Sequence, residues 1–410
     1  MKIKIIFVFI FFLLSISYIF ANDNASKSSK LLELATTEQE TTELKKGMTA
    51  FVRLDLDTAL AAFQKALAIN PQNPATNYII GNVYSVKEMP KQAIASYKKA
   101  LELGFVKTAT YFALAASYYA DNDPKTAFDN FLKAVDTVPV TDFPEVKTKD
   151  YIESWEKNTH TKVETLIWEA IAKDPKNPLL YYIQGIDYVL KADPTGALTT
   201  LQKVIDIDPK YSKAYCSMGL IYLNNGLHQK AVDYFNQAIA ISPDFAVAYY
   251  DKGVALEYNK DGIRKGEGAK LQEAIEAYKK AIELIPDYTW ARINLSTVYA
   301  YLGMKEDALE EGKKAVASDP RDSKAQELLG NYYAALEKYD DAAEHLKIAV
   351  DLAPDNSSVH YNLARVYWFK KDWQNCVKEY QYALNRDPND KDAENGLKQA
   401  RQKLLEEEKK

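Results

Sequence analysis

The chain has 410 residues, of which 47% are apolar and 27% charged, and these values are typical of a folded protein and exclude a disordered one. Its 52 Lys and Arg residues and 57 Asp and Glu residues give a net charge of −5, which argues against a phosphate-binding surface and a nucleic-acid partner. Two cysteines, Cys216 and Cys376, cannot form a disulfide-rich scaffold, and no CxxC pair suggests a zinc site.

Residues 1–21 predict a secretory signal. A basic start with Lys2 and Lys4 precedes an apolar run, and cleavage is expected after Ala21. The alternative is an uncleaved membrane anchor, because the apolar segment lies at the lower limit of spanning length. Either interpretation places the rest of the chain outside the cytoplasm, whether periplasmic, in the cell envelope or secreted. Residues 22–39 are polar and rich in Ser and Thr, and are expected to form a linker.

Residues 40–390 divide into ten units marked by a ladder of prolines, most of them 34 residues apart, as are Pro209 and Pro243. Each unit shows two apolar patterns of helical period around a short turn and no strand-like alternation. In one such turn Gly226 suits the left-handed backbone that ends a helix. Residues 391–410 predict a capping helix. The ladder consists of Pro71, Phe105 in place of a proline, Pro139, Pro175, Pro209, Pro243, Pro286, Pro320, Pro354 and Pro388.

Short side chains recur at one position in the first helix of a unit and at one in the second. Two antiparallel helices approach closely only where side chains are short, so these positions predict the contact inside each hairpin. Aromatic residues such as Phe63, Tyr97 and Tyr278 are expected to fill the space between helices. A hairpin cannot bury both its faces alone, so successive hairpins should stack. The sites are Gly47, Gly81, Ala115, Gly185, Gly219, Gly253, Ser296, Gly330 and Ala364 in the first helices, and Ala59, Ala93, Ala127, Ala197, Ala231, Ala274, Ala308, Ala342 and Cys376 in the second.

Two units depart from the pattern. Residues 142–177 lack the small site of the first helix and carry Val163 and Ile167 where a small and an aromatic residue are expected, so this unit is degenerate. Residues 246–288 contain a nine-residue insertion in the turn, which includes the glycines of Gly262–Gly268. These glycines lack the strand–turn–helix context of a nucleotide-binding loop, and the insertion therefore predicts a longer turn.

The recurring Gly, Tyr, Ala, Phe, Ala and Pro positions resemble the tetratricopeptide repeat, whose period is 34 residues. The resemblance covers residues 40–390. It implies an all-α fold, a right-handed superhelical solenoid of stacked antiparallel helix hairpins whose first helices line a concave groove. It also implies a scaffold that binds a peptide or helix of another protein in this groove.

Candidate groove residues lie on the first helices. The position three residues before the small site should face the groove, and in five units it is aromatic, which suits a rigid contact with a peptide. Polar and aromatic residues that project from the same faces are further candidates. The aromatic set is Tyr78, Phe112, Tyr182, Tyr250 and Tyr361, and the further set is Asn82, Trp290, Asn294, Lys324, Asn331, Arg365 and Trp368.

The four histidines lie in different units without metal-ligand spacing, and no hydrolase or phosphate-loop motif occurs. We therefore expect no enzyme activity, no metal and no cofactor, and a protein or peptide as the partner. Two alternatives stay open. The groove or the Gly262–Gly268 turn could bind a carbohydrate or small molecule, or the chain could target substrates to a separate enzyme.

Overall fold

A computed structural model describes residues 35–138, 144–159 and 162–408. Within these ranges the chain forms α-helices joined by short turns, and no β-strand occurs among them. The predicted all-helical class is confirmed. The predicted signal, residues 1–21, lies outside the described residues. No helix in the described part of the chain combines the length and apolar character needed to cross a bilayer.

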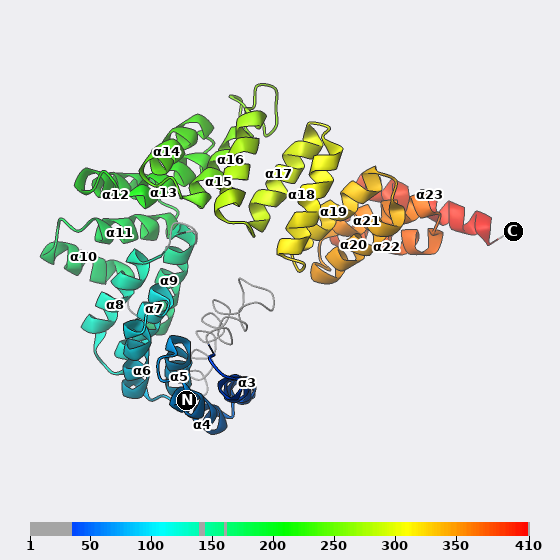
Figure 1. Cartoon of the computed structure of the whole chain (residues 1–410). Helices are drawn as coiled ribbons and strands as arrows, with labels where there is room; N and C mark the ends of the chain where they lie inside the picture. Colours follow the sequence, from blue (N-terminus) through cyan, green and yellow to red (C-terminus); the bar gives the residue numbers. More distant parts are fainter. Residues whose placement is uncertain (1–34, 139–143, 160–161, 409–410) are drawn as a thin grey trace. The chain divides into compact units, whose positions relative to one another are not determined.

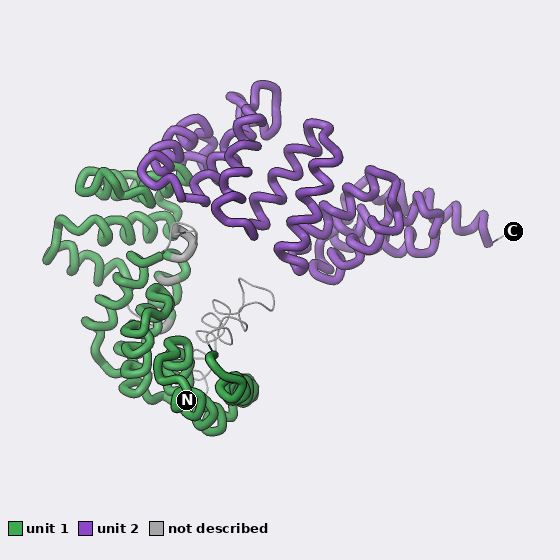
Figure 2. Tube along the Cα trace, viewed as in Figure 1, with its two compact units in different colours: residues 1–221 green, residues 222–410 purple. Residues whose placement is uncertain are grey.

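The chain divides into two compact units, residues 1–221 and residues 222–410, which we describe separately (Figure 2). Unit 1 contains α3 (Glu38–Val52), α4 (Leu56–Ile69), α5 (Pro74–Val86), α6 (Pro90–Glu102), α7 (Lys107–Ala120), α8 (Pro124–Asp136), α9 (Pro144–Thr159), α10 (Val163–Lys173), α11 (Pro178–Leu190) and α12 (Pro194–Ile207). The boundary falls within α13 (Ser212–Asn224). Unit 2 contains α14 (His228–Ile241), α15 (Ala246–Leu256), α16 (Leu271–Leu284), α17 (Thr289–Tyr301), α18 (Lys305–Ser318), α19 (Ser323–Ala335), α20 (Tyr339–Leu352), α21 (Ser357–Lys370), α22 (Trp373–Arg386) and α23 (Lys391–Glu407).

Consecutive helices form hairpins that stack on one another within each unit (Figure 1). In unit 1, α3 packs against α4, α5 against α6, α7 against α8 and α11 against α12. In unit 2 the pairs are α15 with α16, α17 with α18, α19 with α20 and α21 with α22. The second helix of one hairpin contacts the first helix of the next, and α23 covers α22 after the last hairpin. Helix α3 begins at Glu38, inside the segment expected to be a linker.

The small residues bring the two helices of a hairpin together as expected. A Cβ atom added at Gly81 would lie 2.5 Å from the ring of Tyr97, and one added at Gly253 would lie 2.6 Å from the ring of Tyr278. Each tyrosine is buried and lies on the second helix of the hairpin that contains its glycine, Tyr97 on α6 and Tyr278 on α16. The aromatic ring therefore occupies the volume that a side chain on the first helix would need.

Replacing Gly253 with leucine should destabilise unit 2 by about 1–3 kcal/mol, because the fully buried ring of Tyr278 blocks the new side chain. Urea unfolding followed by circular dichroism measures the loss. Ala300→Leu is the control, since Ala300 lies exposed on α17 and a surface substitution usually changes stability by about 0.5 kcal/mol or less. Equal stability of Gly253→Leu and the wild type would contradict this packing.

Cysteine occupies the small second-helix site of the last hairpin. The Cys376 thiol is fully buried, lies 3.3 Å from the carbonyl oxygen of Ala364, and has a pKa that burial raises to about 12. Cys216 is also fully buried, and neither cysteine forms a disulfide. We expect neither to react with a disulfide reagent at pH 8 in the native chain and both to react in urea. Rapid labelling of the native protein would contradict this burial.

Lysines of second helices cover tyrosines of the following first helix. Lys98 Nζ lies 5.5 Å from the ring centroid of Tyr118, and Lys347 Nζ lies 5.8 Å from that of Tyr367. The spacing is 20 residues in both cases, and Lys313 and Tyr333 repeat it at 5.8 Å. These cation–π contacts between neighbouring hairpins account for part of the abundance of tyrosine.

The degenerate segment has an aromatic core of its own. Trp155 of α9 is buried, and its ring centroid lies 5.2 Å from that of Phe131 and 6.0 Å from that of Phe128, both on α8. Val163 and Ile167 of α10 are fully buried despite their departure from the pattern. Large apolar side chains replace the small-residue contact in this part of unit 1.

Candidate functional site

Two of the predicted groove tyrosines, Tyr78 and Tyr182, do not reach solvent. Tyr78 is fully buried, with its ring centroid 4.7 Å from that of Phe105. Tyr182 is also fully buried, 5.3 Å from the ring of Tyr211. Phe105 and Tyr211 each precede the first helix of the next hairpin, so their rings close over the preceding tyrosine. The prediction that Tyr78 and Tyr182 are exposed to a partner is therefore wrong.

The other two candidates of unit 1 also contribute to its interior. Asn82 is 5% exposed, and its Oδ1 accepts a 2.8 Å hydrogen bond from the hydroxyl of Tyr97. Phe112 is half-buried, with its ring 6.4 Å from that of Phe131. Asn82 is thus a structural partner of Tyr97, and the groove assignment for it is wrong as well.

Unit 2 presents most of its candidates on neighbouring first helices, and we call this set the first-helix row. Helix α17 contacts α19, and α19 contacts α21. The row consists of Tyr250 on α15, Trp290 and Asn294 on α17, Lys324, Glu327 and Asn331 on α19, and Ser358, Tyr361, Asn362 and Arg365 on α21. Trp290 is 52% exposed, Lys324, Ser358 and Arg365 are exposed, and the other side chains except Glu327 are half-buried.

Tyr250 and Asn294 join α15 to α17. The Nδ2 of Asn294 donates a 3.3 Å hydrogen bond to the hydroxyl of Tyr250. The Tyr250 ring lies 5.1 Å from Tyr288 and 5.9 Å from Tyr278. Burial raises the pKa of Tyr250 to about 12, so the phenol keeps its proton at neutral pH. Tyr250 and Asn294, which were predicted as candidates in two different repeats, are thus held together in one orientation.

Glu327 joins α19 to α21 and was missed by sequence reasoning. It is 3% exposed, its Oε2 accepts from Lys324 Nζ at 2.9 Å, and its Oε1 accepts from Asn362 Nδ2 at 3.1 Å and Ser358 Oγ at 3.3 Å. Glu327 stands three residues before the small site Gly330, the position at which an aromatic residue predicts a groove contact in other repeats. A polar residue at this position is the sequence signal that indicates it.

The remaining candidates differ in their surroundings. The guanidinium of Arg365 lies 5.9 Å from the ring centroid of Tyr361 in a cation–π contact on α21. Trp368 makes an edge contact with Trp373, 5.1 Å away at the turn of the same hairpin, and lies outside the first-helix row. Asn331 is half-buried on α19.

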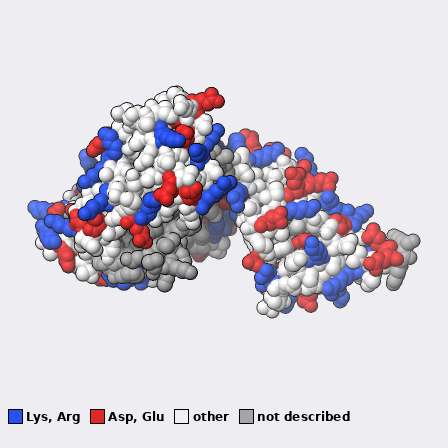
Figure 3. Space-filling model, turned by 90° about the horizontal axis from the view of Figure 1, so that it is seen from below, with Lys and Arg blue, Asp and Glu red and all other residues white. Residues whose placement is uncertain are grey.

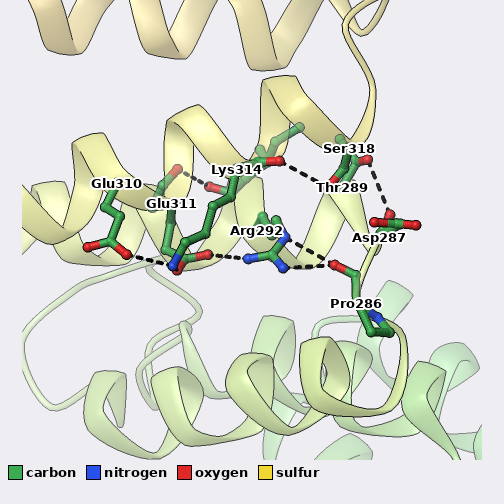
Figure 4. Close-up of polar contacts among 10 residues, drawn as sticks. Pro286, Asp287, Thr289, Arg292, Glu310, Glu311, Lys314 and Ser318 are labelled. Carbon is green, nitrogen blue, oxygen red and sulfur yellow. Dashed lines mark hydrogen bonds and ion pairs between the residues drawn. The ribbon is translucent and has the colours of Figure 1, made fainter. Parts of the chain in front are cut away.

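A side chain four residues before the small site anchors several first helices to the turn before them. In α17, Arg292 donates through Nε and Nη2 to the carbonyl oxygen of Pro286 and through Nη1 to Glu311, which also binds Lys314 (Figure 4). Tyr181, Gln326 and His360 take the same position and bond the carbonyl oxygens of Pro175, Pro320 and Pro354 in the same way. These anchors fix the rotation of α17, α19 and α21 and therefore the direction of their row residues.

The inserted turn is built around a buried carboxylate. Glu257 is fully buried, with Arg264 Nε 2.8 Å from its Oε2 and Lys265 Nζ 3.7 Å away. The hydroxyl of Tyr278 donates to Glu257 Oε1 at 2.5 Å. Two of the cations that a phosphate or other anion would need are thus directed at the protein's own carboxylate. This is a structured turn, in agreement with the prediction for Gly262–Gly268.

Charges of both signs are mixed over the surface seen in Figure 3, and neither sign forms a broad patch on this face. Among the described residues, no group of three or more His, Cys, Asp and Glu side chains is arranged to hold a metal ion.

Models of the family described as "Tetratricopeptide repeat" match residues 74–103, 212–245, 267–332 and 327–393. The chain carries tetratricopeptide repeats. These repeats are typical of scaffolds for protein–protein interaction. The matched segments include α16 to α22 in part or in full, and so they contain most of the first-helix row, although α15 with Tyr250 lies between two of them.

Several solved tetratricopeptide-repeat and related structures are similar to the chain. A chain of the APC/C hetero-tetramer Cut9–Hcn1 is 13% identical to this one. The match covers 90% of this chain and 98% of the Cut9–Hcn1 chain, with a TM-score of 0.46. PilF of Pseudomonas aeruginosa is 15% identical with coverages of 55% and 97% and a TM-score of 0.47. YrrB, described as having an unusual peptide-binding site, is 23% identical with coverages of 47% and 95% and a TM-score of 0.37. No curated protein matches the sequence.

Proposed function

We propose that this chain is a non-enzymatic scaffold that binds a peptide or helix of another protein on the first-helix row of unit 2. One observation carries the proposal: the row is partly exposed and its polar side chains are already oriented by hydrogen bonds between neighbouring repeats, as in Tyr250 with Asn294. The equivalent Tyr78 and Tyr182 of unit 1 are fully buried. Binding is therefore assigned to unit 2.

The chemistry of the row suits a peptide backbone. Asn294 and Asn362 each use Nδ2 to bond a side chain of the preceding repeat, which leaves their carboxamide oxygens to accept from backbone N–H groups. Tyr250 keeps its phenolic proton and can donate it to a carbonyl oxygen. Because these side chains are fixed before binding, a partner loses less side-chain entropy on association.

Peptide selection tests this assignment. A random library of short peptides displayed on phage is selected on the full chain, and the affinity of the best synthetic peptide is measured by fluorescence anisotropy. We expect Trp290→Ala and Arg365→Ala to weaken binding by roughly fivefold or more, as for interface residues that cost over 1 kcal/mol. Tyr382→Ala is the control, since Tyr382 is 45% exposed on the second helix α22. Equal affinity of all three variants and the wild type would place binding elsewhere.

We also propose that the repeats lie outside the cytoplasm, on the basis of residues 1–21. An alkaline phosphatase joined to the C-terminus is active only where its disulfides can form. The fusion should be active, and removal of residues 1–21 should abolish that activity. An inactive full-length fusion would refute export.

A further inference from the structure

A continuous series of contacts leads from the inserted turn to the first-helix row. It begins with Arg264, whose Nε donates to Glu257 Oε2 at 2.8 Å and whose Nη2 donates to Oε1 at 3.2 Å. The backbone N–H of Lys265 also donates to the carbonyl oxygen of Glu257. Glu257 follows the end of α15 directly, so the insertion is fastened to the helix that carries Tyr250.

The series continues through two tyrosines. The hydroxyl of Tyr278 donates to Glu257 Oε1 at 2.5 Å, and burial raises the Tyr278 pKa well above its ordinary value, so this donor keeps its proton. The ring centroids of Tyr278 and Tyr250 are 5.9 Å apart. Tyr250 in turn accepts the hydrogen bond of Asn294. Tyr278 thus contacts Glu257, the anchor of the insertion, through its hydroxyl and the row through its ring.

The insertion stabilises the negative charge of the buried Glu257 carboxylate. A fully buried carboxylate is stable only when cations and hydrogen-bond donors surround it, and Arg264 and Lys265 of the insertion supply the cations. The hairpin of α5 and α6 has no insertion, and its equivalent Tyr97 donates to the neutral Asn82 instead. The carboxylate and the insertion therefore form one device that fixes the hydroxyl of Tyr278.

We propose that the inserted turn positions Tyr250 for partner binding, and that Arg264 and Tyr278 are positioning residues for the first-helix row. This inference rests on the proposed function, because it assigns a support to the same binding site. In this proposal the insertion acts on the partner only through Tyr250, so breaking the series should change affinity without removing any group that touches the peptide.

The test uses the peptide selected on the wild-type chain. Arg264→Gln breaks the series at the insertion, and Tyr278→Phe breaks it at the hydroxyl while keeping the ring that packs on Gly253. We expect each variant to weaken peptide binding by roughly 2- to 30-fold, the range reported for changes along a coupled network. Lys260→Gln is the matched control, because Lys260 is an exposed cation in the same insertion. It should leave affinity unchanged.

A second comparison separates positioning from a general loss of structure. In a Tyr250→Ala background, Arg264→Gln should change peptide affinity less than twofold, because the residue it positions is already absent. Partial unfolding would lower affinity in both backgrounds. If Arg264→Gln does not fold, as judged by circular dichroism, Tyr278→Phe decides the question. A peptide that depends on Tyr250 but binds both variants with wild-type affinity overturns this inference alone. A library that yields no peptide dependent on the row overturns the proposed function and the inference with it.

Discussion

Replacing Phe131 with alanine is expected to destabilise unit 1 by about 3–5 kcal/mol, the loss typical of a fully buried phenylalanine. Phe131 on α8 is fully buried, and its ring lies 5.2 Å from Trp155 on α9 and 5.9 Å from Phe128. The degenerate segment lacks the small-residue contact of the other hairpins and depends on these rings. Removing one leaves a cavity between α8 and α9.

Urea unfolding of the full chain, followed through the fluorescence of Trp155 after the other tryptophans are replaced, measures this loss. Val189→Ala is the control: Val189 lies on α11 of the same unit and is 43% exposed, so its replacement should cost about 1 kcal/mol or less. Similar losses for the two variants would show that the aromatic cluster does not stabilise unit 1 as described.

Replacing Asn73 with alanine is expected to cost about 2–4 kcal/mol, because Asn73 performs two tasks. Its Oδ1 accepts a hydrogen bond from the backbone N–H of Thr76 and so caps α5. Its Nδ2 donates a 2.8 Å hydrogen bond to Oε1 of the fully buried Glu40. Asn70 and Thr36 also donate to this carboxylate. A buried carboxylate that loses a donor is costly.

Asn177→Ala provides the matched control for Asn73→Ala. Asn177 also caps its helix, α11, through a hydrogen bond from the N–H of Leu179, but it bonds no carboxylate within the described part of the chain. Its replacement should cost about 1 kcal/mol, the loss of a cap alone. Chemical denaturation of both variants gives the comparison. An Asn73→Ala protein as stable as Asn177→Ala would show that the hydrogen bond from Asn73 to Glu40 does not stabilise the fold.

The helix hairpins could be predicted from sequence because each one repeats the same physical requirement. Gly81 and Gly253 are small because an aromatic ring of the second helix fills the space above them, and this constraint returns with the period of the repeat. Likewise, Gly226 was expected to adopt a left-handed backbone, and its φ of +74° agrees. Such requirements are local to one hairpin.

The candidate site was predicted less well because exposure depends on the neighbouring hairpin. Tyr78, Tyr182 and Tyr250 share one repeat position, yet Phe105 and Tyr211 bury the first two completely while Tyr250 remains half-buried beside Tyr288. Periodicity placed all three on the same helix face and could not rank their exposure.

Polar contacts between repeats were also beyond the sequence pattern. Glu327 binds Lys324, Ser358 and Asn362 over a separation of up to 35 residues. Likewise, Glu257 is surrounded by cations of an insertion that has no counterpart in the other units. Only the spatial arrangement of the helices shows that these side chains meet.

Site-specific photo-crosslinking in the native host tests the assignment of binding to the first-helix row most directly. A photoreactive phenylalanine analogue is placed at Trp290, 52% exposed on α17, and separately at Tyr382, 45% exposed on α22. We predict a defined protein adduct from position 290 that the selected peptide suppresses in permeabilised cells, and no such adduct from position 382. An adduct from position 382 that the peptide suppresses, with none from position 290, would contradict the account.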